Sequence, residues 1–437
     1  MKAILQPLYF KSGMDDEFKS HLDLMNKFLK DEADINEPVE VGKPIKYADA
    51  IILPQLLGDA FKQIELLKKI KLPILVTTSD FGTVNMWDWE IVTFLKAEGL
   101  KVFAPYSFDL TKKLCKSFAL KREMKKTKFL VFQDNPGAGM QAEIFKRFYW
   151  WEERCQEAIK EKFGISIVKK SFKELAEKAK KISDAEAAQT AAQKIIPYEG
   201  VSERALLNAC KIYLAIKEEI ENDPDIKGAG INCLNESFYS DTTPCLAWSL
   251  LYEEKGLLWS CEADTMSLAT MYLIQKSIDA DLVMSNIYPF LMGMAALKHE
   301  RIDKFPEVEE PQNHLLVVHC GYFGVVPRCI ASEWTLRKKV LAIVDENATA
   351  IDARLPLGEV VLTKLHPNLD KLMVVKGVLE NYVQYPGSDC RNGALIKVED
   401  GYRLMDLFYS HHNCIIVGNK TEDLKFIAKV FDIDIVS

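Results

Sequence analysis

The sequence predicts an α/β protein with two doubly wound, Rossmann-like domains followed by a mostly antiparallel β domain. Over roughly the first 310 of the 437 residues, short apolar runs alternate with amphipathic stretches, which is typical of parallel strands joined by helices. After about Asn313, short strands separated by turn residues predominate, and this favours an antiparallel sheet. A chain of this length also exceeds one ordinary core. We therefore expect domains at residues 1–120, 121–312 and 313–437.

The first section alternates strands and helices from its start. Strands are expected at Ala3–Leu8, Ala48–Leu53, Pro73–Thr78 and Lys101–Ala104, with helices at Asp16–Lys30, Asp59–Ile70 and Trp87–Glu98. The basic segment Lys112–Lys128 then interrupts the alternation, and we place the first boundary there.

The second section repeats the pattern. Strands are expected at Phe129–Phe132, Ile165–Lys169, Ile226–Cys233 and Leu257–Cys261, with helices at Gln141–Lys162, Phe172–Ile182, Ser202–Asp223 and Pro244–Glu254. In open parallel sheets, ligands bind beyond the carboxyl ends of strands. The segments Asn232–Glu236 and Glu262–Asp264 both lie at such ends, so this section is the predicted site.

The third section is rich in strands. They are expected at Leu315–His319, Gly358–Leu365, Lys371–Leu379, Gly393–Val398 and Cys414–Val417, followed by a helix at Thr421–Phe431. Strands this close together pair as an antiparallel sheet or a barrel.

Composition argues against some classes of protein and indicates a compartment. The formal charge of −7 without a compensating basic block argues against a nucleic-acid binder. No apolar run reaches the roughly 18 residues that a membrane helix needs, and the start lacks a signal-peptide pattern. The ten Cys form no CxxC pair, which indicates free thiols in a reducing compartment. We expect a cytoplasmic protein.

Three polar clusters are candidates for chemistry. They are Asn232–Ser237 with Asp241 nearby, Cys261–Asp264, and His411-His412-Asn413. Two carboxylates and an imidazole could bind a divalent cation with coordination positions left for substrate. An acid at the start of a helix also satisfies free N–H groups, and a histidine pair also suits a surface or capping role. The residues alone leave both interpretations open.

Several longer motifs occur in a fixed order along the chain. They are Thr78–Glu90 ending in Asn85-Met86-Trp87-Asp88-Trp89-Glu90, then Pro244–Leu251, Gly256, Cys261–Asp264, His319-Cys320-Gly321, Gly358–Leu365, Asp389-Cys390-Arg391 and His411–Gly418. Together they resemble the L-fucose isomerase-like proteins of the L-arabinose isomerase superfamily, which are sugar ketol isomerases. The resemblance covers nearly the whole chain and implies the same three-part fold.

The resemblance assigns roles to several residues. Asp264 matches the family's metal-binding aspartate, and His412 matches its metal-binding histidine. The family's other ligand, a glutamate that also transfers protons, aligns near Cys245. Glu236 or Asp241 could supply that carboxylate, and Glu236 is our choice. The implied catalytic pair is therefore Glu236 and Asp264, and the implied metal ligands are Glu236, Asp264 and His412.

The resemblance also implies a reaction and an assembly. A divalent ion, Mn²⁺ by expectation, would hold two sugar oxygens while a proton moves through a cis-enediol. His319 and Arg391 are the expected substrate contacts, and an arginine suits an anionic sugar derivative. Trp87 and Trp89 would contact the substrate from a neighbouring subunit, because hexamers with active sites at subunit interfaces are usual in the family. Alternatively, His319 could simply end a strand, and Arg391 could be a loop residue with a surface partner.

Other functions remain open at this point. Because a carboxylate is missing near Cys245, the chain could be a catalytically altered or inactive sugar-binding relative. An epimerase or lyase would use the same enediolate stabilisation. Metal binding that depends on Asp264 and His412 would favour the enzymes, and sugar binding without metal would favour the inactive relative.

Overall fold

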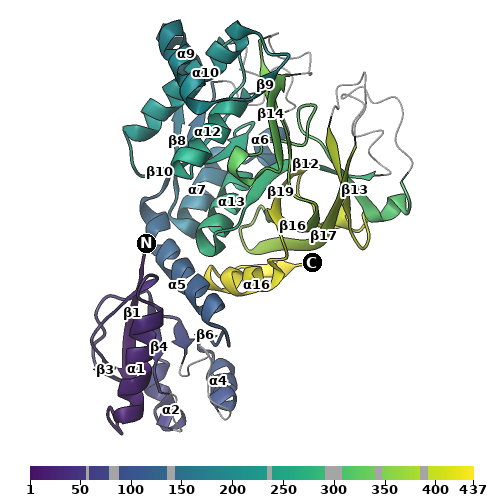
Figure 1. Cartoon of the computed structure of the whole chain (residues 1–437). Coiled ribbons are helices and arrows are strands. Elements are labelled where there is room, and N and C mark those ends of the chain that lie inside the picture. Colours follow the sequence, from purple (N-terminus) through teal and green to yellow (C-terminus); the bar gives the residue numbers. More distant parts are fainter. Residues whose placement is uncertain are drawn as a thin grey trace. The chain divides into compact units, whose positions relative to one another are not determined.

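The computed structural model describes residues 1–55, 59–77, 88–134, 143–233, 239–290, 308–339, 347–383 and 392–437 (Figure 1). These residues form two compact units. The first is Met1–Glu123 with Lys276–Ile278 and Lys429–Phe431, and the second is Met124–Gln275 with Asp279–Ala428 and Asp432–Ser437. The first unit thus ends close to the predicted boundary at residue 120, whereas residues on both sides of position 312 belong to one unit.

The first unit is built on a parallel sheet. Its strand order is β2-β1-β4-β5-β6, and β3 also pairs with β1. The strands are β1 Ala3–Tyr9, β2 Ala33–Ile35, β3 Val39–Glu40, β4 Ala50–Leu53, β5 Ile74–Val76 and β6 Val102–Phe103. The central strands β4 and β5 are buried along their whole length, which explains why they appear in the sequence as continuous apolar runs.

The helices of the first unit correct two predictions. They are α1 Asp16–Phe28, α2 Asp59–Lys62, α3 Ile64–Leu67, α4 Asp88–Ala97 and α5 Phe108–Glu123. The single helix predicted at Asp59–Ile70 is two short ones. The prediction that Lys112–Lys128 interrupts the pattern was wrong, because most of it is α5, whose Leu114 and Phe118 are buried while its lysines lie on the other positions.

The second unit begins with another parallel sheet. Its order is β11-β10-β7-β8, so the strand that comes first in the chain lies inside the sheet. The strands are β7 Lys128–Phe132, β8 Ser166–Lys170, β10 Ile226–Ile231 and β11 Leu258–Cys261. The helices are α6 Phe145–Phe148, α7 Glu153–Phe163, α8 Phe172–Lys181, α9 Asp184–Lys194, α10 Glu203–Glu221, α12 Cys245–Lys255 and α13 Thr265–Ile278.

The later strands form a closed antiparallel sheet. The order β16-β19-β12-β13-β18-β17 returns to β16, because β16 pairs with both β19 and β17. The strands are β12 Leu282–Pro289, β13 His314–Val317, β16 Gly358–Leu365, β17 Lys371–Val383, β18 Gly393–Lys397 and β19 His412–Val417. They appear in green to yellow in Figure 1. Closure of this kind leaves no unpaired edge among these strands.

Smaller elements complete the second unit. A three-stranded sheet has the order β15-β14-β9, from β9 Tyr198–Glu199, β14 Glu333–Lys338 and β15 Thr349–Arg354. The remaining elements are the short helix α15 Leu404–Leu407, the helix α16 Thr421–Val430 and the strand β20 Asp434–Val436, which pairs with β17 in parallel.

The chain is therefore a mixed α/β protein with parallel sheets and a separate antiparallel, barrel-like sheet. The barrel includes β12, which precedes the predicted boundary at 312. None of the helices in the described part of the chain has the length and apolar character needed to cross a bilayer.

Candidate metal centre

The carboxyl end of β11 leads into a tight turn that carries two acids. Glu262 and Ala263 both adopt left-handed backbone conformations, with φ of 52° and 55°. Such conformations are unfavourable for residues other than glycine and are concentrated at functional sites. The turn is held by Trp151, whose Nε1 donates to the Ala263 carbonyl at 3.1 Å. It ends at Asp264, the N-cap of α13.

Two histidines come from the antiparallel sheet. His412 begins β19 and is fully buried, opposite Asn286 of β12. His319 follows β13 and lies in a short bridge with Tyr322. Its Nδ1 lies 3.0 Å from the sulfur of Cys320. The parallel sheet and the barrel-like sheet of this unit thus bring together residues that are far apart in the sequence.

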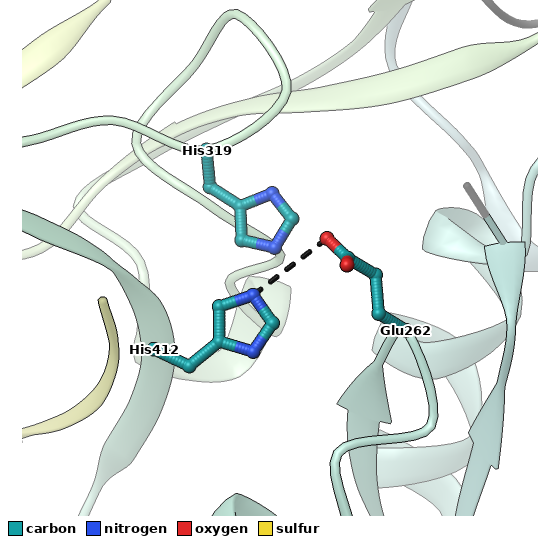
Figure 2. A group of neighbouring side chains, drawn as sticks. All are labelled: Glu262, His319 and His412. Atoms are coloured by element: carbon teal, nitrogen blue, oxygen red, sulfur yellow. Dashed lines mark ion pairs between the residues drawn. The ribbon is translucent and has the colours of Figure 1, made fainter. Parts of the chain in front are cut away.

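Glu262, His319 and His412 form one buried group. One ligand atom from each residue lies within 4.8 Å of the others. Figure 2 shows both imidazole rings turned toward the carboxylate, with His412 Nε2 3.6 Å from Glu262 Oε1. Nε2 of His319 and Nε2 of His412 are both buried and make no hydrogen bond in the structure. Buried nitrogens in this condition are costly unless a ligand such as a metal ion satisfies them.

Asp264 lies behind this group. Its Oδ2 accepts hydrogen bonds from His412 Nδ1 at 3.0 Å, Lys364 Nζ at 2.9 Å and Ser267 Oγ at 2.8 Å. Its Oδ1 accepts from the backbone N–H of Ser267 at 2.8 Å. The capping role that the sequence allowed for Asp264 is therefore confirmed. Both oxygens are engaged, and Lys364 balances the buried charge.

For Glu262 and His319, the electrostatics favour the protonation states that bind metals. Burial alone would raise the pKa of Glu262, but His412 and the neighbouring histidines lower it to about 2. The pKa of Asp264 is lowered as well, since Lys364 and His412 outweigh burial. Burial lowers the pKa of His319 to about 3. At neutral pH, Glu262 is thus an anion and His319 is a neutral imidazole.

His412 has a defined tautomer in this setting. Burial would lower its pKa, but the hydrogen bond to Asp264 and the nearby Glu262 carboxylate raise it above the usual value. The ionised Asp264 can only accept, so His412 Nδ1 must donate. The raised pKa favours a second proton on Nε2, and a metal ion that displaced this proton would meet the Nε2 lone pair beside Glu262 and His319. Tyr149 fixes the ring plane further by stacking on it, with ring centroids 4.3 Å apart.

These residues fit a divalent transition-metal ion. Two imidazoles and one carboxylate supply three ligands and leave other positions for substrate. An acid that accepts the second ring N–H of a ligating histidine is the usual support for such sites. Asp264 occupies that supporting place relative to His412.

The structure brings some of the predicted site residues together and leaves others undescribed. Asp264, His319 and His412 lie together, whereas Trp89 belongs to α4 in the first unit, where its side chain is 51% exposed. Glu236, Arg391 and Trp87 lie outside the described residues, and their predicted roles stay predictions. Asp241, the alternative to Glu236, is described and has φ of 56°, and Cys245, with which the family glutamate aligns, is the buried first residue of α12.

Glu262 is the residue that sequence reasoning overlooked. It stands two positions before Asp264 in the same motif, and both acids follow the same strand. Spacing could not show that Asp264 bonds Nδ1 of His412 while Glu262 lies beside its Nε2. The contact predicted for His319 was with substrate, whereas its Nε2 lies among the potential metal ligands. Nothing in the sequence indicated Lys364 as a site residue, since the lysine of an apolar strand ordinarily faces solvent.

Comparisons with known proteins add no name to this geometry. A scan of protein-family models finds no match to the chain, and no curated protein matches its sequence significantly.

Proposed function

We propose that the protein is a metal-dependent aldose–ketose isomerase that acts on a sugar or an anionic sugar derivative through a cis-enediol. The observation that supports this most is the buried Glu262, His319 and His412 group, backed by Asp264. The sequence motifs that resemble L-fucose and L-arabinose isomerases supply the reaction type. The geometry supports it with a buried group of two imidazoles and one carboxylate, drawn from three of those motifs, that could hold a metal.

In this proposal, Glu262, His319 and His412 hold a divalent metal, Mn²⁺ by expectation. Such an ion would polarise neighbouring hydroxyl and carbonyl oxygens of an open-chain sugar and so acidify the C2 proton. Asp264 keeps the proton on His412 Nδ1 and thereby keeps Nε2 available. Lys364 holds Asp264 in its ionised form, so the protein contributes one carboxylate to the ligand set and one to its support.

Proton transfer needs a carboxylate that is free to accept. Asp264 was predicted for this task, but its oxygens already accept four hydrogen bonds from Ser267, Lys364 and His412. We therefore propose a positioning role for Asp264. Glu236 remains the proposed base, since it follows β10, the neighbour of the strand that carries Glu262.

Several finer features belong to the same proposal. They are membership of the L-fucose isomerase-like group, two doubly wound domains before the β domain, a cytoplasmic location, and a homo-hexamer with active sites at subunit interfaces. The strand orders of the two parallel sheets support the doubly wound topology, because in each sheet the first strand lies inside.

The first test is proton exchange. Protein stripped with chelator and reloaded with Mn²⁺ would be incubated in deuterium oxide with a panel of aldoses, including phosphorylated and sulfonated ones, and followed by NMR. Metal-dependent C2 exchange with ketose formation is expected. Exchange without a ketose would indicate an epimerase, and metal binding without exchange across the panel would contradict the isomerase.

Variants connect the activity to the site. His319→Ala and His412→Ala should each abolish exchange and weaken Mn²⁺ binding measured by calorimetry. His366→Ala is the matched control, because this histidine lies in a turn of the same unit with a quarter of its side chain exposed. Unchanged Mn²⁺ affinity in both site variants would remove the basis of the proposal.

A further inference from the structure

Asn286 is a buried residue whose side-chain amide has no partner. It lies in β12 and is only 8% exposed. Its Oδ1 is buried and accepts no hydrogen bond. Among the described residues, none accepts a hydrogen bond from its Nδ2 either. Burying an amide oxygen in this condition is costly, and a hydrogen-bond donor or a cation would satisfy it.

Strand register places Asn286 beside a proposed metal ligand. Asn286 and His412 stand directly opposite each other in the antiparallel pairing of β12 with β19. The side chains of such a pair lie on the same face of the sheet, with Cβ atoms about 5 Å apart. The pairing therefore brings the amide next to the imidazole whose Nε2 also lacks a hydrogen bond.

The face that carries Asn286 packs against the turn after β11. Alternate residues of a strand share a face. Met284, two residues before Asn286, accepts the backbone N–H of Cys261 on its sulfur at 3.3 Å, and Cys261 directly precedes Glu262. Cys414, on the same face of β19, donates from its sulfur to a backbone carbonyl of α13 at 3.8 Å. These contacts show that the amide lies on the side of the sheet where Glu262 is found.

Strand β12 also separates the two strands that lead to the histidines. It pairs with β19 on one side and with β13 on the other. The carbonyl of Asn286 accepts the backbone N–H of Val318 at 3.2 Å, and Val318 directly precedes His319. Strands two places apart in a sheet are about 10 Å apart. The ring centroids of His319 and His412 are only 5.9 Å apart, so the rings approach each other across β12 at the level of Asn286.

We propose that Oδ1 of Asn286 is a fourth protein ligand of the metal ion held by Glu262, His319 and His412. This rests on the proposed function, because it concerns the same metal site. An amide carbonyl oxygen is a hard, neutral donor, and such oxygens suit Mn²⁺ and Mg²⁺. Four protein ligands would leave a six-coordinate ion two further positions, as many as two neighbouring sugar oxygens require.

A rotated amide is the competing interpretation. Exchanging the two ends of the side chain would put Nδ2 where Oδ1 lies, and Nδ2 could then donate to a histidine Nε2 when no metal is bound. In that arrangement Asn286 would compete with the metal ion for the histidine, so removing the amide would strengthen metal binding. The two interpretations thus predict opposite effects of the same variant.

The first measurement is the Mn²⁺ affinity of full-length protein stripped with chelator, by calorimetry. Wild type is compared with Asn286→Leu, which keeps a similar size and removes the oxygen. We expect Mn²⁺ to bind about 10- to 100-fold more weakly to the variant, a loss as large as that typical of residues that support metal ligands. Unchanged or tighter binding would overturn the assignment.

Asn413→Leu is the matched control. Asn413 is also buried and stands next to His412, but alternation along β19 puts it on the other face. Its Nδ2 donates to the Ser410 carbonyl at 3.0 Å, so its substitution should cost stability and leave Mn²⁺ affinity unchanged. An equal loss of affinity in the two variants would show a general disturbance of the sheet and overturn the ligand role.

Asn286→Asp tests the oxygen itself. The aspartate puts an anionic oxygen in the same place, so Mn²⁺ should bind at least as tightly as it does to wild type. Without metal, the added buried charge should lower Tm, and Mn²⁺ should therefore raise the Tm of this variant more than that of wild type. Mn²⁺ binding as weak as in Asn286→Leu would contradict an oxygen ligand at this position.

Proton exchange on the same samples separates this inference from the proposed function. If wild type binds Mn²⁺ through Asn286 but exchanges no C2 proton of any aldose, the ligand role stands and the isomerase is contradicted. If exchange occurs and Asn286→Leu raises KM at unchanged Mn²⁺ affinity, the isomerase stands. Asn286 would then be a substrate contact, and the ligand role would be overturned.

Discussion

At the scale of single residues, the two ring nitrogens of His412 serve different neighbours. Nδ1 donates to Asp264, and Nε2 faces Glu262 and His319. Asp264→Asn should weaken Mn²⁺ binding about 10- to 100-fold, because a neutral amide no longer fixes the tautomer and basicity of the imidazole. Calorimetric titration checks this. Asp16→Asn, at a fully exposed carboxylate, should have no effect, and equal affinities in all three proteins would contradict the positioning role.

The buried pair of Asp264 and Lys364 predicts strong coupling. Both side chains are at most 1% exposed. Lys364→Met should lower the free energy of unfolding by about 3–5 kcal/mol, because the buried carboxylate loses its counter-ion. Adding Asp264→Asn should restore part of that loss. Urea denaturation measures both. The exposed pair Lys425 and Glu422 is the control, with an expected coupling of about 0–1 kcal/mol, and additivity at the buried pair would contradict the prediction.

The sequence predicted where the site lies in the chain, but not the direction in which each side chain points. The motif Cys261–Asp264 and the histidine pair were recognised, so the place of the site was identified. Both acids contact His412, and which of its two ring nitrogens each acid meets is set in a turn where Glu262 and Ala263 are left-handed. In a sequence, glycine is the residue that most clearly indicates a left-handed conformation, and neither of these residues is glycine.

At the scale of elements, β10 leaves room for the turn after β11 because its Gly230 has no side chain. A Cβ on Gly230 would lie 2.6 Å from Ser260 Oγ and 3.0 Å from the Ala263 Cα. Gly230→Ala should therefore displace the Glu262 turn and weaken Mn²⁺ binding tenfold or more, at a cost of about 1–3 kcal/mol in stability.

The same strand provides the control for that prediction. A Cβ on Gly228 would meet the end of the Leu268 side chain at 2.9 Å, which can move. Gly228→Ala should therefore lose some stability and keep its Mn²⁺ affinity. Thermal unfolding and calorimetric titration compare the two variants, and identical metal affinities would show that Gly230 does not support the turn.

Helix α10 predicts a dependence of stability on pH. Glu219 accepts from Lys178 at 2.8 Å and also bonds Lys170 of β8. Burial would raise the pKa of Glu219, but these lysines lower it. The stabilisation that ionised Glu219 contributes is thus complete above its unfolded pKa of about 4.3. It is lost as pH falls through the lower pKa of Glu219 in the folded protein. Glu219→Gln should be less stable than wild type at pH 7, and the difference should shrink below about pH 4.

Urea unfolding at both pH values measures this difference. Glu218→Gln is the control, since Glu218 also pairs with Lys178 but is 60% exposed, and it should show a small difference at either pH. A Glu219→Gln difference that stays constant with pH would contradict the assignment.

Elements differ in how well sequence predicted them. The predictions for β1, β7 and β16 are close to the structure, because their apolar runs are bounded by turn residues or charged segments. Helix α5 was missed because its lysines conceal a regular pattern of buried positions. Strand β14 was missed because most of its residues are at least partly exposed, and its partners are β15 and β9, the second of which is remote in the chain. Strand β15, which is mostly buried, was missed as well.

At the scale of the whole molecule, the metal group belongs to the second unit alone. Metal binding should therefore stabilise that unit by about 2.7 kcal/mol when the metal is at a hundred times its Kd. Hydrogen exchange should slow in β11, β13 and β19 on adding Mn²⁺ and stay unchanged within residues 1–123. Equal slowing throughout the first unit would contradict this.

The closed pairing of β16 with both β17 and β19 has a consequence for how the protein folds. Glu262, His319 and His412 are spread over about a third of the chain, and the last of them takes its place only when β19 enters the ring. Such long-range contacts form late, so a metal ion cannot act as a nucleus. A bound metal ion should therefore leave the refolding rate nearly unchanged and slow the rate of unfolding.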